Sequence, residues 1–230
     1  MFVTGLLLAA DSSPHLGVPR QLLAYHGDTL LGATLDVART CGFDQLIVTL
    51  GSAADQIRDR VDLDGVRVVD SPHADTGSSS IVPALDAVDR RTDGIVVMLG
   101  DQPGVTSATV WSLVAEVAGP ATPIGVCRYD DGHGHPCWFG RELFGQLRQL
   151  RSDDDLWDLI EGGRYPLTQV DAIGNIPARA GTWDDYRRLV SGHTPALGAF
   201  TPGAFEDAPI DDAHPVPLPT RPRRRRRTAS

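Results

Sequence analysis

Two charged side chains, Asp101 and Arg20, have types and positions suited to the chemistry of phosphate groups. Asp101 directly follows the apolar run Ile95–Leu99, and its carboxylate is a ligand that suits a Mg²⁺ ion bridging triphosphate oxygens. Arg20 lies in a polar, turn-prone loop after the apolar run Phe2–Ala10, and its planar guanidinium binds phosphate oxygens as a fork. Open α/β sheets place ligands in loops at the carboxyl ends of buried strands. We therefore expect both side chains at the ligand edge of one sheet.

Two further segments carry weaker signals, and each has a purely structural alternative. The segment Ser71–Ser80 places glycine and serines before a predicted helix, and a helix N-terminus suits anions because its first amides are unpaired. Plain helix capping explains the same serines. His135 lies between a glycine and a proline, where it either orients a substrate phosphate or makes a hydrogen bond within a tight turn. Asp101 has the alternative role of a turn or capping residue.

Apolar runs and helical segments alternate along the chain, as is typical of a parallel, doubly wound sheet. We therefore predict an α/β fold with a mostly parallel sheet in one domain. The predicted strands cover Phe2–Ala10, Gln45–Leu50, Val66–Asp70, Ile95–Leu99 and Pro123–Cys127, with a short apolar segment at Pro136–Phe139. The predicted helices run from a cap at Asp28 to about Cys41, from Ala53 to Val61, from Ser79 to Arg90 and from Ser107 to Ala118.

Composition and charge exclude several classes of protein. The chain has 230 residues, a formal net charge of −9 and 41% hydrophobic residues. Its acidic body argues against broad nucleic-acid binding. The cysteines are odd in number and lack CxxC spacing, so neither a disulfide framework nor a zinc site is predicted. No apolar run approaches the ~20 residues of a membrane span, and the N-terminus has no basic leader. We expect a cytoplasmic protein without a membrane partner.

The composition changes from Ser191 onward. Residues 191–230 contain seven prolines and end in Arg221, Pro222 and five consecutive arginines. Such a segment buries too little surface to offset its ordering entropy. We therefore predict a folded domain over residues 1–190 and a disordered tail over residues 191–230. Nucleic acid is not expected as a partner except through the tail, where Arg221–Arg227 could bind nucleic acid, an acidic partner or membrane phosphate. A solvated tail, or one that folds back loosely on the acidic body, is the favoured alternative.

The loop after the first strand resembles the opening signature of the MobA-like nucleotidyltransferases, LAAGxSxRxGxPKxLL. The matching residues are Leu8, Ala9, Ala10, Ser13, Gly17, Pro19, Leu22 and Leu23. Gly100–Pro103 resembles the GDQP motif, which is more similar to the molybdopterin cytidylyltransferase branch of that family. The resemblance extends over about residues 3–190 and implies a three-layer, Rossmann-like domain. It also implies that Asp101 holds Mg²⁺ and that Arg20 neutralises phosphate charge.

The same resemblance implies which residues surround each substrate. The residues implied to frame the nucleotide are Ala9, Ala10, Asp11, Ser13, Gly17, Arg20, Gly77 and Ser78. His135 and Asp153 lie in segments that resemble the acceptor side of the family's site. We therefore expect these two residues to contact the acceptor.

Four positions depart from the family's pattern. Asp11 stands in place of the loop glycine, His15 in place of an arginine and Arg20 in place of a lysine. The 21 residues counted as lysine or arginine are all arginine, so Arg20 reflects the cation that this chain uses throughout. Gly181 stands where the resemblance places the second metal-binding aspartate. Because this aspartate is absent, the hypothesis is that the Asp11 carboxylate supplies the missing negative charge from the opposite side of the site.

These residues favour a nucleotidyltransferase, with two alternatives. The resemblance implies transfer of a nucleoside monophosphate, CMP from CTP, to a small phosphorylated acceptor such as molybdopterin. The departures favour a weakened relative that binds a molybdenum cofactor or assists the maturation of a molybdenum hydroxylase, with a molybdenum enzyme as partner. The third hypothesis is an NAD(P)H-dependent oxidoreductase resembling nicotine blue oxidoreductase, although no GxGxxG follows the first strand.

Overall fold

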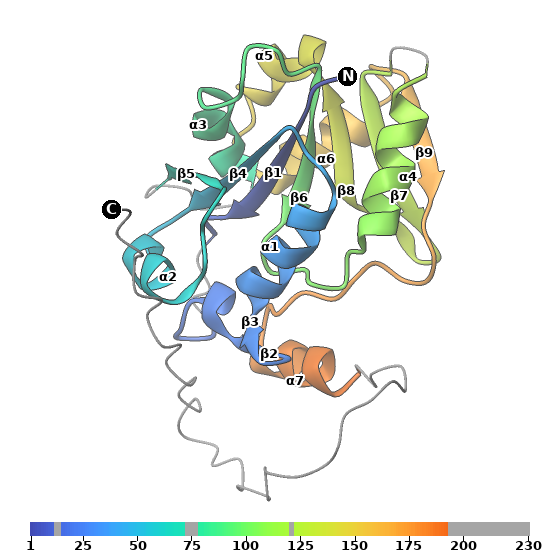
Figure 1. Ribbon diagram of the computed structural model, residues 1–230. Helices are drawn as coiled ribbons and strands as arrows, with labels where there is room; N and C mark the ends of the chain where they lie inside the picture. Colours follow the sequence, from blue (N-terminus) through green and yellow to red (C-terminus); the bar gives the residue numbers. More distant parts are fainter. Residues whose placement is uncertain (12–14, 72–77, 120–121, 193–230) are drawn as a thin grey trace, which may run out of the picture.

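A seven-stranded sheet forms the centre of the molecule, with helices on both of its faces (Figure 1). The computed structural model describes residues 1–11, 15–71, 78–119 and 122–192. Residues 193–230, which make up nearly all of the predicted tail, lie outside these ranges. The strands of the sheet are β1 (Val3–Ala9), β4 (Gln45–Leu50), β5 (Arg67–Asp70), β6 (Gly94–Leu99), β7 (Ile124–Tyr129), β8 (Gly132–Gly140) and β9 (Leu167–Asp171).

The order and direction of the strands confirm the predicted doubly wound, mostly parallel sheet. The order is β5-β4-β1-β6-β8-β7-β9. β1 pairs in parallel with β4 and β6, and β4 pairs in parallel with β5. The loops after these strands therefore meet at one edge of the sheet. β8 runs antiparallel to β6 and β7, which brings its N-terminal half, including His135, to that same edge.

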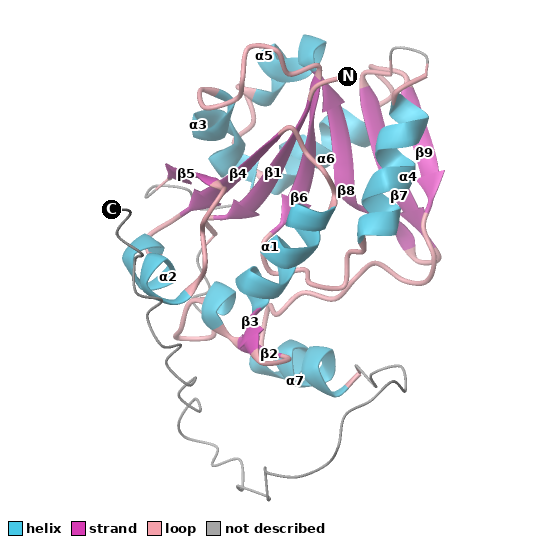
Figure 2. Cartoon of the chain, in the orientation of Figure 1, coloured by secondary structure: helices cyan, strands magenta, loops and turns pink. Residues whose placement is uncertain are grey.

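The helices form two layers, as the three-layer prediction requires (Figure 2). One face of the sheet is covered by α1 (Leu30–Thr40), α2 (Ala54–Arg60) and α4 (Ser107–Val117). The other face is covered by α3 (Ile81–Leu85), α5 (Phe144–Leu147) and α6 (Asp153–Glu161). The last helix, α7 (Trp183–Ser191), packs beside the small hairpin of β2 (Ala24–Tyr25) and β3 (Asp28–Thr29). No helix of the described ranges combines the length and apolar character needed to cross a membrane.

The buried strand β1 joins the two halves of the core. All seven of its residues are buried. Leu7 packs into the cluster on the side of α1 and α4, whereas Leu6 and Leu8 pack into the cluster on the opposite side. This alternation follows from the two-residue period of a strand. Because burial of each leucine stabilises the fold by ~1.5–3 kcal/mol, β1 anchors the loop that follows it.

Two predicted helix boundaries were wrong. α1 is capped by Thr29, whose Oγ1 accepts from the amide of Gly32 at 2.9 Å, rather than by Asp28. The predicted helix from Ser79 to Arg90 is a short 3₁₀ turn, η2 (Ser78–Ser80), followed by the five-residue α3. The partly buried first residue of β4 explains the shorter helix, because Gln45 Nε2 donates to the carbonyl of Ala87 at 2.9 Å and its Oε1 accepts from the amide of Asp89 at 2.9 Å. These bonds replace the helical ones that the prediction assumed.

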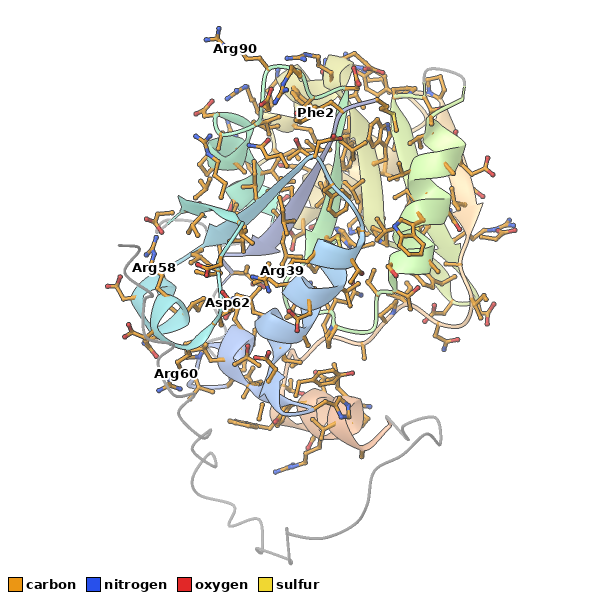
Figure 3. The ribbon with its side chains drawn as sticks, viewed as in Figure 1. Phe2, Arg39, Arg58, Arg60, Asp62 and Arg90 are labelled. Atoms are coloured by element: carbon orange, nitrogen blue, oxygen red, sulfur yellow. The ribbon has the colours of Figure 1, made fainter. Side chains whose placement is uncertain are left out.

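At the surface, Arg39 of α1 extends toward the loop that contains Asp62 (Figure 3). Its guanidinium donates to the carbonyl oxygen of Asp62 at 2.7 Å and to the carboxylate of Asp36 at 3.0 Å. Exposed pairs of this kind contribute ~1 kcal/mol or less. Arg39 therefore positions the loop after α2 without dominating its stability.

Candidate active site at the carboxyl edge of the sheet

The loop after β1 is held close to the sheet by the buried side chain of Gln21. Its Nε2 donates to the carbonyl oxygens of Ala9 and Asp11 at 2.9 and 3.0 Å. A side chain at Gly51, just after β4, would overlap the carbonyl oxygen of Ala10. The loop therefore lies directly against the end of β4, and the position of Asp11 is set by contacts on both sides.

Asp101, which follows β6, belongs to a group of four charged side chains and forms ion pairs with two of them. Arg179 Nε donates to both carboxylate oxygens of Asp101 at 3.0 Å, and Arg20 donates to one of them at 3.1 Å. Asp11 Oδ2 lies 3.2 Å from a terminal nitrogen of Arg179 and 3.6 Å from one of Arg20. We name Asp11, Arg20, Asp101 and Arg179 the charge network. The Asp101 side chain is only 3% exposed, so these pairs lie largely out of water.

Burial and neighbouring charges act in opposite directions within the charge network. Burial raises the pKa of Asp11, the charge of Asp101 raises it further, and Arg20 and Arg179 oppose both effects. Burial lowers the pKa of Arg179, but the carboxylates of Asp101 and Asp11 outweigh burial, so the net shift is upward. Two guanidinium groups thus face two carboxylates, and such pairing is what makes buried charges tolerable.

The charge network, as arranged, does not fit the Mg²⁺ that the resemblance implies at Asp101. Mg²⁺ requires near-octahedral oxygen ligands at ~2.1 Å, whereas both oxygens of Asp101 accept hydrogen bonds from guanidinium groups. Among the described residues, no three His, Cys, Asp or Glu side chains gather into a group that could hold a metal ion. Gly181, in place of the family's second aspartate, supplies no ligand.

A cavity of about 180 Å³ lies beside the charge network, between the end of β6, the start of β8 and α6. We name it the β8 cavity. Its lining includes Gln102, His135, Asp153, Trp157, Ile176 and Arg179. The ring of His135 meets the ring of Trp157 edge-on, with the ring centroids 5.6 Å apart. The cavity thus combines an aromatic wall with several polar groups, as small-molecule sites commonly do.

Two buried polar atoms of residues that line the β8 cavity have no hydrogen-bond partner within the described ranges: Gln102 Oε1 and His135 Nε2. Gln102 is oriented by its own Nε2, which donates to the carbonyl of Pro177 at 2.5 Å. Burial lowers the pKa of His135 to about 4, and the charge of Arg179 lowers it further, so the imidazole is neutral at pH 7. Buried polar atoms are normally paired. Both unpaired atoms belong to side chains that line the β8 cavity.

A second cavity, of about 260 Å³, lies on the other side of the charge network. We name it the loop cavity. Its lining includes Ala10, Asp11, Gly17, Pro19, Gly51 and Ser52. Gly17 has a φ of 66°, a left-handed conformation that glycine adopts readily. Asp11 lines the loop cavity and Arg179 lines the β8 cavity, so the ion pair between them joins the two.

The structure brings most of the predicted site residues to one edge of the sheet. Ala9, Ala10, Asp11 and Gly17 line the loop cavity, Arg20 and Asp101 belong to the charge network, and His135 and Asp153 line the β8 cavity. Ser78 lies in η2. Ser13 and Gly77 lie outside the described residues. The roles given to these residues remain predictions.

Three residues of the site were missed by sequence reasoning: Gln21, Gln102 and Arg179. Gln21 donates to the carbonyls of Ala9 and Asp11, for which the sequence offers no signal. Gln102 lies in the Gly100–Pro103 motif, but its hydrogen bond to the carbonyl of Pro177, 75 positions away, could not be predicted. Arg179 did carry a weak signal, since it lies two positions before Gly181, in a segment that departs from the family's pattern.

Solved structures of similar proteins share this fold. A crystal structure of the Mycobacterium tuberculosis Rv0371c homologue from Mycobacterium sp. strain JC1 is 48% identical, with a TM-score of 0.78, and the match covers 83% of this chain and 96% of that one. Rv0371c from Mycobacterium tuberculosis H37Rv is 50% identical, with a TM-score of 0.76 and coverage of 82% and 97%. A structure of Rv0371c in complex with manganese is 48% identical, with a TM-score of 0.76 and coverage of 84% and 100%.

One curated relative is named as an oxidoreductase. Nicotine blue oxidoreductase from Paenarthrobacter nicotinovorans is 34% identical over 113 residues, which are 49% of this chain and 55% of that protein. The chain thus spans about half the length of this relative.

One family model, described as the MobA-like NTP transferase domain, matches residues 5–170. The matched residues include the loop after β1, Asp101 and most of the β8 cavity, but not Arg179. With this match over most of its length, the chain belongs to the MobA-like NTP transferase family.

Proposed function

We propose that the protein is a nucleotidyltransferase that transfers a nucleoside monophosphate from a nucleoside triphosphate to a small phosphorylated acceptor. One observation carries this proposal: two cavities at the ligand edge of the sheet lie on either side of a network that contains two arginines. A transferase needs a separate place for each substrate and, between them, guanidinium or other cationic groups that can contact the phosphoryl oxygens.

The loop cavity is proposed to bind the nucleotide. Its walls are mostly backbone and small side chains, which permit close approach of a base and ribose. Further contacts to the nucleotide are proposed for Ser13, Gly77 and Ser78. CTP is the proposed donor, because the Gly100–Pro103 segment resembles the motif of the cytidylyltransferase branch.

The β8 cavity is proposed to bind the acceptor. Gln102 Oε1 accepts hydrogen bonds only, whereas the neutral His135 either donates or accepts at Nε2. An uncharged heterocycle with N–H groups, as in molybdopterin, supplies the matching partners. A molybdenum enzyme is then the proposed user of the product, and the cytoplasm the proposed compartment.

The proposed reaction is an in-line displacement at the α-phosphorus. An acceptor phosphate oxygen forms a bond to the α-phosphorus, the bond to the oxygen that bridges the α- and β-phosphates breaks, and pyrophosphate leaves with that electron pair. Arg20 and Arg179 are proposed to stabilise the charge that spreads over the phosphate oxygens. Since the charge network does not fit Mg²⁺ as arranged, no step is assigned to this ion.

The test is calorimetric titration of the full chain with CTP, GTP and ATP. We expect binding of one triphosphate that is weakened about tenfold or more in Arg20→Ala, because a charge-assisted contact to phosphate is lost. Arg128→Ala is the matched control, since Arg128 forms an exposed ion pair with Asp171. Absence of binding by every triphosphate, or equal weakening in both variants, would overturn the proposal.

A second candidate is an NAD(P)H-dependent oxidoreductase, favoured by the 34% identity to nicotine blue oxidoreductase. The same titration with NADPH separates the two. Binding of NADPH without binding of any triphosphate, followed by loss of NADPH absorbance when an oxidised heteroaromatic compound is added, would support the oxidoreductase instead.

A further inference from the structure

Asp101, the one residue of this chain that the resemblance assigns to a metal, binds the guanidinium group of Arg179 together with Asp11. We infer that Arg179 is the resident cation of this centre and that a divalent metal binds Asp11 and Asp101 only by displacing it. The inference concerns the site of the proposed function and rests on that proposal only in treating the site as a transferase centre.

The first step of the argument is position. Arg179 bridges two carboxylates that come from the ends of different strands: its Nε lies 3.0 Å from both oxygens of Asp101, and its terminal nitrogen lies 3.2 Å from Asp11 Oδ2. A metal ion bridging the same carboxylates would have to lie ~2.1 Å from their oxygens. The guanidinium and the metal therefore require the same space.

The second step is the difference in exposure between the partners. The side chains of Asp101 and Asp11 are 3% and 15% exposed, whereas that of Arg179 is 34% exposed. The carboxylates are thus fixed within the protein, and the cation is the partner that reaches solvent. Displacement of Arg179 moves its charge outward into water, so exchange for another cation is possible without opening the core.

The third step is the backbone that carries Arg179. The carbonyl of Pro177 accepts from Gln102 Nε2 at 2.5 Å, and Ala180 is fully buried beside α7. The flanking backbone is therefore anchored on both sides, so only the side chain of Arg179 has to be ordered for it to reach the carboxylates. A preorganised competitor of this kind weakens metal binding.

Exchange would also change the charge of the centre. With Arg179 in place, two carboxylates face two guanidinium groups and the formal charge is zero. With a divalent ion in place of Arg179, and Arg20 still bound, the charge becomes +1. Metal entry would thus increase the attraction of the centre for a triphosphate.

The test is titration of the full chain with Mn²⁺ alone, without nucleotide, followed by electron paramagnetic resonance of the free ion. We expect Arg179→Ala to bind Mn²⁺ about tenfold more tightly than the unmodified chain, because the competing cation is gone. Arg179→Ala/Asp101→Asn should lose this gain, and the control Arg128→Ala should match the unmodified chain. Equal Mn²⁺ affinity with and without Arg179, or a gain that survives in the double variant, would overturn the inference.

A second measurement covers the case in which Arg179→Ala folds poorly. Arg179→Gln keeps much of the side-chain volume but removes the charge, and its melting temperature with and without Mn²⁺ reports binding through stabilisation of the folded state. We expect Mn²⁺ to raise the melting temperature of Arg179→Gln more than that of the unmodified chain, and equal shifts would refute the competition. Failure of the chain to bind any triphosphate would contradict the proposed function but leave this result unaffected.

Discussion

Acidification should destabilise the protein through His135, because this side chain is buried in its neutral form. Its pKa falls from an ordinary value near 6.5 to about 4, chiefly by burial and then by the charge of Arg179. The unfolded chain therefore binds a proton at a higher pH than the folded one. Stability from this group is fully present above pH 6.5 and is lost as the pH falls toward 4. At 1.36 kcal/mol per unit of pKa, the whole shift corresponds to about 3 kcal/mol.

The assay is urea denaturation of the unmodified chain and of His135→Gln at pH 7 and pH 4.5. The carboxylates contribute to both proteins, so the difference between their pH-dependent losses isolates His135. We expect the unmodified chain to lose about 2 kcal/mol more than His135→Gln between these pH values. His133→Gln is the control, since His133 lies on the same strand but is partly exposed beside Glu161. Equal losses in the unmodified chain and His135→Gln would refute the argument that His135 is buried and neutral.

Three further substitutions test other parts of the site. Asp101→Asn should lower the free energy of unfolding by about 3 kcal/mol, because it leaves two guanidinium groups facing one carboxylate, whereas Asp171→Asn at an exposed pair should cost less than about 1 kcal/mol. Similar losses in urea titrations of the two variants would contradict the structure. Gly51→Ala should cost more than about 2 kcal/mol, since the added carbon meets the Ala10 carbonyl. Gly145→Ala, with no atom near the added carbon, should be neutral or stabilising by up to about 1 kcal/mol, and thermal melting that ranks the pair in the opposite order would reject this reasoning. Ser152→Ala should cost about 1 kcal/mol by removing the capping box of α6, and an unchanged melting temperature would show that this cap is dispensable.

The fold was predictable where one physical pattern dominates a segment. The strands predicted at Gln45–Leu50 and Ile95–Leu99 became β4 and β6 almost to the residue, because aliphatic and β-branched residues dominate both segments. The sequence did not indicate that the helix predicted to reach Arg90 ends at Leu85. This end depends on the side chain of Gln45, which captures the backbone near Ala87 from more than forty residues away along the chain.

The candidate site was likewise predictable where a regular pattern positions its residues, and not where contacts between distant residues do. Asp101 and the loop after β1 were expected together because parallel strands deliver their following loops to one edge, and Arg20 does reach Asp101. Arg179 comes from an irregular segment between β9 and α7, where no periodic pattern indicates direction. Its partner Asp101 lies 78 positions earlier in the sequence, so only the folded chain shows the pairing.

That pairing gives the departures from the family's pattern a common physical reason. An aspartate at position 11, in place of glycine, would add an unpaired charge beside Asp101 if the site held no cation nearby. Without Asp11 and Asp101, the partly buried guanidinium of Arg179 would have no carboxylate partner in the charge network. Both requirements are met together, since Arg179 contacts both carboxylates. Asp11 thus has an ion-pair partner in Arg179, whereas the hypothesis that Asp11 replaces a lost metal ligand stays a prediction. Because Arg179 also lines the β8 cavity, an anion that binds there would compete with Asp11 for the guanidinium, and this competition couples the two cavities through one side chain.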